Sequence, residues 1–178
     1  MAASTDQPTL VLLHGLLGNA DDWRPVIEAL SGIDCHALDL PGHGHNQHLR
    51  VNGFDEANAW LCGELAARDI EHYRLAGYSL GGRLALYHAS QSPAGLQALL
   101  LENCHPGLPE AERAARLAHD EGWARRFEQE PLPLVLADWY RQGVFADLDE
   151  TARALQAARR LGNEGPAIAT MLRATSLG

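Results

Sequence analysis

The chain has 178 residues, of which 46% are hydrophobic and 21% charged, proportions typical of one globular domain with a sizeable core. Its formal net charge of −9 argues against binding to nucleic acids or acidic membranes, so neither is expected as a partner. The three cysteines are odd in number and lack CxxC spacing. This pattern argues against a disulfide framework or a thiolate metal site, and it is typical of a reducing compartment.

Neither a membrane span nor an export signal is apparent in the sequence. No run approaches 18 uninterrupted apolar residues, and residues 1–7 lack a basic stretch followed by an apolar one. We therefore expect a cytoplasmic protein.

The first part of the chain alternates strand and helix patterns. Strands are predicted at residues 9–14, 33–40, 72–78 and 96–101, and helices at 22–31, 54–70 and 80–90. Asp21 or Asp22 is the expected cap of the first helix. Such alternation predicts right-handed crossovers and a mostly parallel sheet, hence an α/β fold with four strands. The run at 96–101 is apolar without alternation, which is typical of a strand covered on both faces.

After Pro106 the alternation stops. Residues 109–176 carry helical patterns only, arranged as four arginine-rich helices separated by prolines and glycines. We interpret them as a helical lid inserted into the sheet. The predicted domains are therefore a core over residues 1–105 and a lid over residues 106–178.

The motif GYSLGG at residues 77–82 fits G-x-S-x-G and lies between a predicted strand and a predicted helix. That context is what a nucleophile elbow requires, because the glycines let backbone crowd around a serine held in a strained turn. The hydroxyl of Ser79 would then project beside the positive N-terminus of the next helix. The alternative is that Ser79 merely caps that helix in an ordinary crossover.

Three motifs together resemble the α/β-hydrolase superfamily: HG at 14–15, DLPGHG at 39–44 and GYSLGGR at 77–83. Three further segments are more specific: ENCHPGL at 102–108, ADWY at 137–140 and ATSL at 174–177. They resemble the 2-succinyl-6-hydroxy-2,4-cyclohexadiene-1-carboxylate synthases of menaquinone biosynthesis. The resemblance runs from about residue 9 to 178.

This resemblance implies a lyase that removes a proton from a cyclohexene substrate and expels pyruvate without a cofactor or metal. Ser79 would act mainly as a base activated by a catalytic triad. An oxyanion hole would receive the developing enolate charge, with the backbone N–H groups of Leu16 and Leu80 as donors. The full-length protein is expected to be a monomer.

The resemblance also implies a small substrate that carries several carboxylates, which arginines can bind in a bidentate way. Arg83 corresponds to one such arginine, Arg116 in the first lid helix to a second, and Arg160 near the end of the fourth lid helix to a third. The remaining expected substrate-binding residues line the pocket or lie next to it: Trp139, Tyr78 and His14. His14 would act mainly as a hydrogen-bonded residue near the core.

In this superfamily the triad runs serine, acid, histidine in chain order, and here the acid and the histidine would follow the lid. Because the chain ends at Gly178, we expect both residues and the C-terminal strands to be absent, in a truncated chain. Glu102 and His105 are the possible substitutes in this chain. Since they lie in the ENCHPGL segment, we interpret them as lining the site instead.

The run His43-x-His45-x-x-His48 resembles a zinc motif, but Gln47 stands where that motif has aspartate, so no metal site is predicted.

Two other kinds of function stay open. A generic serine esterase or thioesterase is the alternative enzyme, and an inactive fragment or binding protein is the alternative outside enzymes. Convergence of Arg83, Arg116 and Arg160 would favour the lyase, because a neutral ester does not need three cations.

Overall fold

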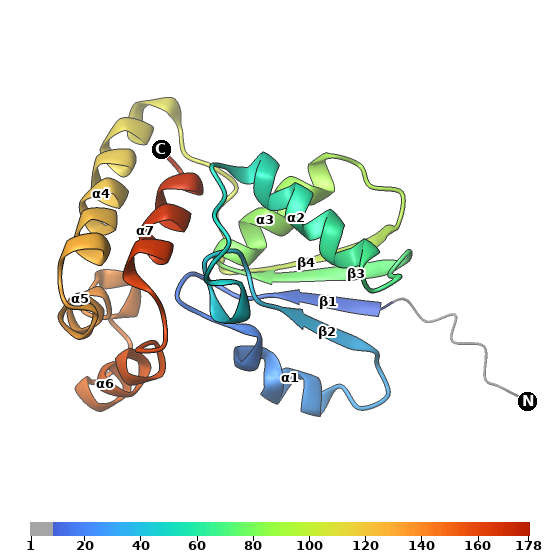
Figure 1. Cartoon of the computed structure of the whole chain (residues 1–178), viewed down its shortest axis with the longest axis horizontal. Coiled ribbons are helices and arrows are strands. Elements are labelled where there is room, and N and C mark those ends of the chain that lie inside the picture. The colour runs from blue at the N-terminus through green and yellow to red at the C-terminus, as the bar shows by residue number, and fades with distance from the viewer. Residues whose placement is uncertain (1–8) are drawn as a thin grey trace, which may run out of the picture.

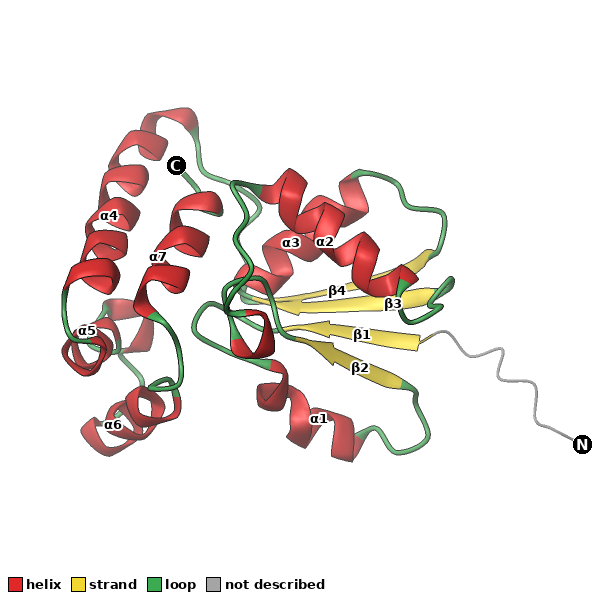
Figure 2. Cartoon of the chain, viewed as in Figure 1, coloured by secondary structure: helices red, strands yellow, loops and turns green. Residues whose placement is uncertain are grey.

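The computed structural model describes residues 9–178, so the expectation for residues 1–7 lies outside the described residues. Four strands form one sheet in the order β2-β1-β3-β4 (Figure 2). They are β1 (Thr9–Leu13), β2 (Cys35–Leu38), β3 (Tyr73–Tyr78) and β4 (Leu96–Glu102). All three pairings are parallel, which confirms the predicted α/β class and strand number.

Three helices connect these strands: α1 (Arg24–Ala29), α2 (Phe54–Ala66) and α3 (Leu80–Ser90). In Figure 1, α2 and α3 lie on one side of the sheet and α1 on the other. Leu61 of α2 and Leu84 of α3 are fully buried in the same cluster as Val11 and Leu75 of the strands. This face of the sheet is therefore the well-packed one.

The first helix differs from its prediction. A 3₁₀ turn at Ala20–Trp23 precedes α1, and Asp22 does not begin the helix but accepts a hydrogen bond from the Asn19 N–H at 3.2 Å. The helix is also poorly covered, since Val26 is 40% exposed. The apolar spacing was correct, but it marks a face that the described residues leave open.

The four predicted lid helices are present: α4 (Glu110–Gln129), α5 (Leu132–Trp139), α6 (Glu150–Arg159) and α7 (Gly165–Ala174). They gather beside the carboxyl ends of the strands, and α7 packs along α4 (Figure 1). No helix of the described residues is both long and apolar enough to cross a membrane. The domain division at residues 105 and 106 stays a prediction.

Two hydrophobic clusters correspond to the sheet and the lid, and each includes a residue from the other part of the chain. Met171 of α7 belongs to the sheet cluster, whereas Leu17, from the loop after β1, belongs to the lid cluster. Leu16 packs against both. The lid is therefore joined to the sheet through its apolar core as well as through the chain.

The strand β4 departs from the expectation of a strand covered on both faces. It is the edge of the sheet, and Leu100 and Leu101 are 56% and 42% exposed. Together with Trp23 and Val26 of the α1 side, they line an open groove of about 360 Å³. Apolar composition identified the strand correctly, but no described residue pairs with its outer edge.

The motif glycines are sterically required. A Cβ on Gly81 would lie 2.3 Å from the carbonyl oxygen of Leu13, whereas a Cβ on Gly63, within α2, would meet nothing within 4 Å. We expect Gly81→Ala to lower the free energy of unfolding by about 1–3 kcal/mol through overpacking. The matched control Gly63→Ala should raise it by about 0.5–1 kcal/mol, the helix-propensity gain. Urea unfolding measures both; equal effects would contradict the close approach at Gly81.

Candidate active site

Ser79 occupies a strained turn between β3 and α3. Its φ of 52° and ψ of −113° lie in a region that side chains rarely adopt, and its N–H donates to the Glu102 carbonyl oxygen at 2.9 Å. The structure therefore confirms the predicted strand–turn–helix placement. Strain of this kind persists where the surroundings over-determine it, and it is concentrated at active sites.

The serine faces a cavity of about 720 Å³ between the strand ends and the lid. Ser79, Tyr78 and Arg83 line it from the core. Arg116 and Trp139 line it from the lid. With Leu16 and Arg160, seven of the predicted site residues are thus brought to one place from segments far apart in sequence.

Two backbone N–H groups near Ser79 are uncommitted. Among the described residues, neither the N–H of Leu16 nor that of Leu80 donates a hydrogen bond, although the neighbouring N–H groups of Leu17 and Gly81 both do. Leu80 is the first residue of α3, where helix N–H groups have no partner within the helix. Both groups could therefore donate to an anionic oxygen.

A pair of buried histidines holds the loop after β1. His14 Nε2 accepts from the Leu40 N–H at 3.0 Å, and His43 Nε2 accepts from the Leu17 N–H at 3.1 Å. The Nδ1 atoms contact the carbonyl oxygens of Gly15 and Pro41. With both ring nitrogens engaged, His14 has none free for a substrate. These hydrogen bonds agree with the expected role of His14 as a hydrogen-bonded residue near the core, where it holds the loop after β1. Its contact with a substrate stays a prediction.

Burial lowers the pKa of His14 to about 4 and that of His43 to about 3 from the ordinary value of 6.5. The unfolded chain therefore binds more protons than the folded one below pH 6.5, so the free energy of unfolding falls as pH drops toward 4. Above pH 6.5 the neutral pair contributes its full amount to the free energy of unfolding. With up to two protons taken up, the slope approaches about 2.7 kcal/mol per pH unit.

Equilibrium urea unfolding across that pH range measures this dependence. The variant His72→Gln, which changes an exposed histidine, should keep the slope. A level free energy of unfolding would contradict a neutral buried pair.

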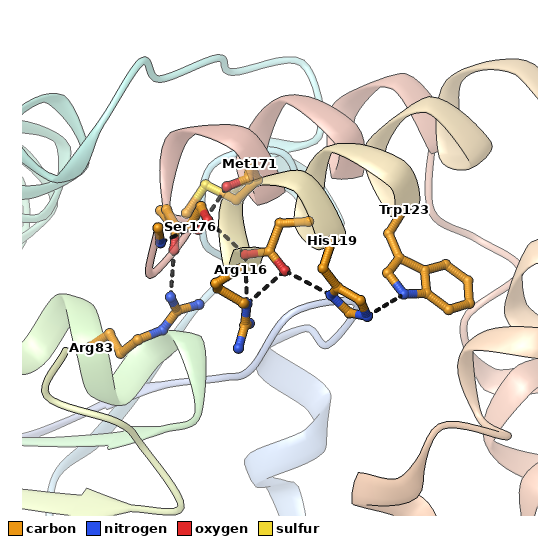
Figure 3. A network of polar contacts seen from close by, with 9 residues as sticks. Arg83, Arg116, His119, Trp123, Met171 and Ser176 are labelled. Atoms are coloured by element: carbon orange, nitrogen blue, oxygen red, sulfur yellow. Dashed lines mark hydrogen bonds and ion pairs between the residues drawn. The ribbon is translucent and has the colours of Figure 1, made fainter. Parts of the chain in front are cut away.

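Arg83 is a partly buried cation without a carboxylate partner among the described residues. Its guanidinium donates to the carbonyl oxygen of Thr175 at the end of α7 (Figure 3). Burial, with the neighbouring charge of Arg116, lowers its pKa to about 10. Arg83 remains charged at neutral pH, and an anion in the cavity would compensate it.

Arg116 is oriented by a buried carboxylate that the sequence analysis missed. Its Nε lies 2.8 Å from both oxygens of Asp120, which is 3% exposed and also accepts from Ser176 Oγ at 2.7 Å. Figure 3 shows this network joining α4 to the segment after α7. An arginine and an aspartate four residues apart on a predicted helix are a signal that could have found the pair.

Arg160 differs from its prediction in two respects. It follows α6, the third lid helix rather than the fourth, and its Nη1 binds both oxygens of Asp22 at 2.9 and 2.7 Å. This ion pair raises its pKa against the effect of burial. Arg160 does line the Ser79 cavity, but its charge is already compensated there.

Comparison with known proteins agrees with this geometry. Residues 8–177 match the family described as the alpha/beta hydrolase fold. The chain belongs to the alpha/beta hydrolase fold family. Among solved structures of this fold, MenH from S. aureus superposes with a TM-score of 0.84 at 28% identity, covering 94% of this chain and 66% of that one. A hydrolase from Pseudomonas aeruginosa superposes with a TM-score of 0.78 at 18% identity, over 96% of this chain and 64% of that one, and so supports the fold alone.

Two relatives in sequence bear the same name, 2-succinyl-6-hydroxy-2,4-cyclohexadiene-1-carboxylate synthase. The protein of Yersinia pestis (strain Pestoides F) is 52% identical over 173 residues, which are 96% of this chain and 64% of the relative. That of Pectobacterium atrosepticum is 47% identical over 179 residues, 99% of this chain and 71% of the relative. This chain therefore spans about two thirds of the length of the relatives that it matches.

An alpha/beta hydrolase also needs a group that takes the serine proton. Of the described histidines, His119 alone lines the Ser79 cavity, and its nitrogens contact Asp120 and Trp123. His105 lines a different cavity and accepts from the Gly107 N–H. Glu102 binds Ser79 only through its carbonyl oxygen. Glu102 and His105 therefore do not form a substitute triad among the described residues.

The histidine run does not assemble a metal site in the described residues. His43 is buried and committed to the backbone, whereas the exposed His45 bonds Asp39. No group of three or more potential metal ligands occurs in residues 9–178. The loop that carries His43 and His45 serves to hold the alpha/beta hydrolase core together.

Proposed function

We propose that this chain supplies the serine and the substrate-binding residues of an enzyme of menaquinone biosynthesis, as its resemblance to the 2-succinyl-6-hydroxy-2,4-cyclohexadiene-1-carboxylate synthases implies. The proposed substrate is a cyclohexene polycarboxylate from which pyruvate is eliminated. The observation that carries the proposal is Arg83, a partly buried cation without a carboxylate partner in residues 9–178, beside Arg116 in the cavity of Ser79. A neutral substrate would leave this charge uncompensated.

Each residue has a distinct role in the proposed reaction. Ser79 takes the proton from the substrate, and the N–H groups of Leu16 and Leu80 donate to the enolate oxygen that forms. Arg83 and Arg116 hold carboxylates, and Trp139 and Tyr78 line the walls of the pocket. No metal or cofactor is proposed. The serine is a weak base alone, so turnover further requires a group that accepts its proton.

The alternative is hydrolysis of an ester or thioester by the same serine. The strained turn and the free N–H groups suit acyl transfer equally well, so the arginines discriminate the two. We also propose a cytoplasmic location, and a monomer at the length of the relatives.

Binding of the proposed cyclohexene polycarboxylate tests the proposal. We expect Arg83→Ala to weaken binding by roughly 1.5–3 kcal/mol, because it removes one charge-assisted contact. Arg116→Ala should weaken binding by less, since Asp120 already pairs with that arginine. Arg160→Ala should have a smaller effect, since Asp22 already compensates that arginine. Isothermal titration measures the affinities.

The control is Arg125→Ala, which removes an exposed arginine of α4 paired with Glu121. It should leave the affinity unchanged. Unaltered affinity in both Arg83→Ala and Arg116→Ala, or hydrolysis of neutral esters with no binding of the polycarboxylate, would contradict the lyase proposal in favour of an esterase.

A further inference from the structure

The loop at residues 15–18 is held at Leu17 by hydrogen bonds to both the core and the lid. The Leu17 N–H donates to His43 in the core, and its carbonyl oxygen accepts from Asn163 Nδ2 in the lid at 3.0 Å. The same Asn163 amide donates to the Arg160 carbonyl oxygen at 3.0 Å. One lid side chain thus ties the connection after α6 to the loop that carries the Leu16 N–H.

Leu17 has an unfavourable backbone conformation that needs such restraint. Its φ is 67°, in the left-handed region that leucine rarely adopts, and its side chain is 1% exposed. That conformation turns the side chain into the lid cluster, where it packs with Phe127, Ile168 and Leu172. The loop therefore owes its shape to the lid as much as to the sheet.

A second tie lies next to the first. Arg160 binds Asp22, and Asp22 Oδ2 also accepts from the Asn19 N–H directly after the loop. The side chain of Arg160 is 13% exposed and that of Asp22 34%, so solvent screens this ion pair from the Asp22 side. Gly18 leaves no room for adjustment, because a Cβ there would lie 2.7 Å from Asp22 Oδ2.

We propose that Asn163 is a positioning residue that holds the Leu16 N–H toward Ser79 through Leu17, with the Asp22–Arg160 pair as a second tie. The inference rests on the proposed function for the oxyanion role of Leu16. The lid then does more than cover the cavity, since its seating on the core sets one of the two donors.

Hydrogen–deuterium exchange of the 178-residue chain, followed by mass spectrometry, tests the tie directly. In Asn163→Ala, we expect the hydrogen-bonded amides of Leu17 and Gly18 to exchange roughly tenfold faster, while β3 amides keep their rates. Thr170→Val is the matched control, because it removes an exposed side-chain bond to the Pro166 carbonyl oxygen on α7. It should change neither segment.

Unchanged exchange at residues 15–18, or equal acceleration in β3, would overturn the inference. If Asn163→Ala fails to fold, Asp22→Asn preserves the side-chain shape and weakens the second tie. It should accelerate the amides of Leu17 and Gly18 by a smaller factor, and acceleration elsewhere would again count against the proposal.

Affinity for phenylboronic acid separates positioning from stability. Ser79 Oγ adds to boron to form a tetrahedral boronate anion, and the hydroxyl proton passes to solvent. We expect Asn163→Ala to weaken Ser79-dependent binding about tenfold or more, because the anionic oxygen loses an aligned donor. Equal binding by wild type and Asn163→Ala would overturn the positioning role.

The two proposals fail in different ways. Boronate binding that survives Ser79→Ala, or none in the wild-type chain, counts against the proposed function. In that event the exchange experiment still decides whether Asn163 holds the loop.

Discussion

Replacement of Ser79 by alanine is expected to lower kcat for pyruvate release by about 10⁴- to 10⁶-fold, the loss typical of triad serines. The reason is positional: Ser79 is the hydroxyl that the β3–α3 turn presents to the cavity beside Arg83. The fold should survive, because Ser79 is held by its backbone N–H, which alanine retains. Thermal melting measures this second part.

Turnover is measured in a chimaera that adds the part of the Yersinia relative without a counterpart here. Pyruvate is detected by its enzymatic reduction. Ser92→Ala is the control, since Ser92 is an exposed serine with a similar positive φ of 53°. It should retain full activity, and a Ser79→Ala chimaera within tenfold of wild type would remove Ser79 from the mechanism.

The 178-residue chain alone is expected to show no turnover. Both nitrogens of His119 are engaged, and His105 lies in another cavity. Without a proton acceptor, the serine cannot act as a base at a useful rate. Activity in this chain equal to that of the chimaera would mean that a described residue supplies this function.

Much of the core could be predicted because its signals are local. The turn around Ser79 requires small residues at Gly77 and Gly81, and the apolar runs on either side set its context. The helix α3 was predicted at its observed bounds. Such features depend on residues a few positions apart, which a single sequence displays directly.

The arrangement of charges in the site could not be predicted in the same way. Asp22 and Arg160 are separated by 138 residues, and nothing in either segment marks the other as its partner. Asp120 is buried only because α7 packs against α4. His14 holds the loop after β1 because the loop that carries His43 folds beside it, with the two ring centroids 5.1 Å apart.

Which segment covers β4 could not be predicted from the sequence, for a related reason. An apolar strand indicates that its side chains should be buried, but not which segment covers them. In the described residues its outer edge has no partner strand, and Leu100 lines the open groove beside α1. The strand β4 contains no lysine or proline, and its only charged residue is Glu102 at its end. Its pairing with β3 has no irregularity other than the register shift at Tyr73 and Arg74.

The 178-residue chain is accordingly expected to self-associate through β4, more so as its concentration rises. Unpaired N–H and C=O groups along an apolar edge are a template for strand pairing between molecules, and Leu100 adds exposed apolar area. Leu100→Lys should restore a monomer, because each pairing would then bring together two desolvated ammonium groups. Leu155→Lys is the matched control, since Leu155 of α6 is 53% exposed but distant in sequence from the sheet. Sedimentation velocity over a range of concentrations distinguishes the three proteins. A wild-type chain that stays monomeric throughout, or a Leu155→Lys variant that dissociates as fully as Leu100→Lys, would show that the edge of β4 is not the associating surface.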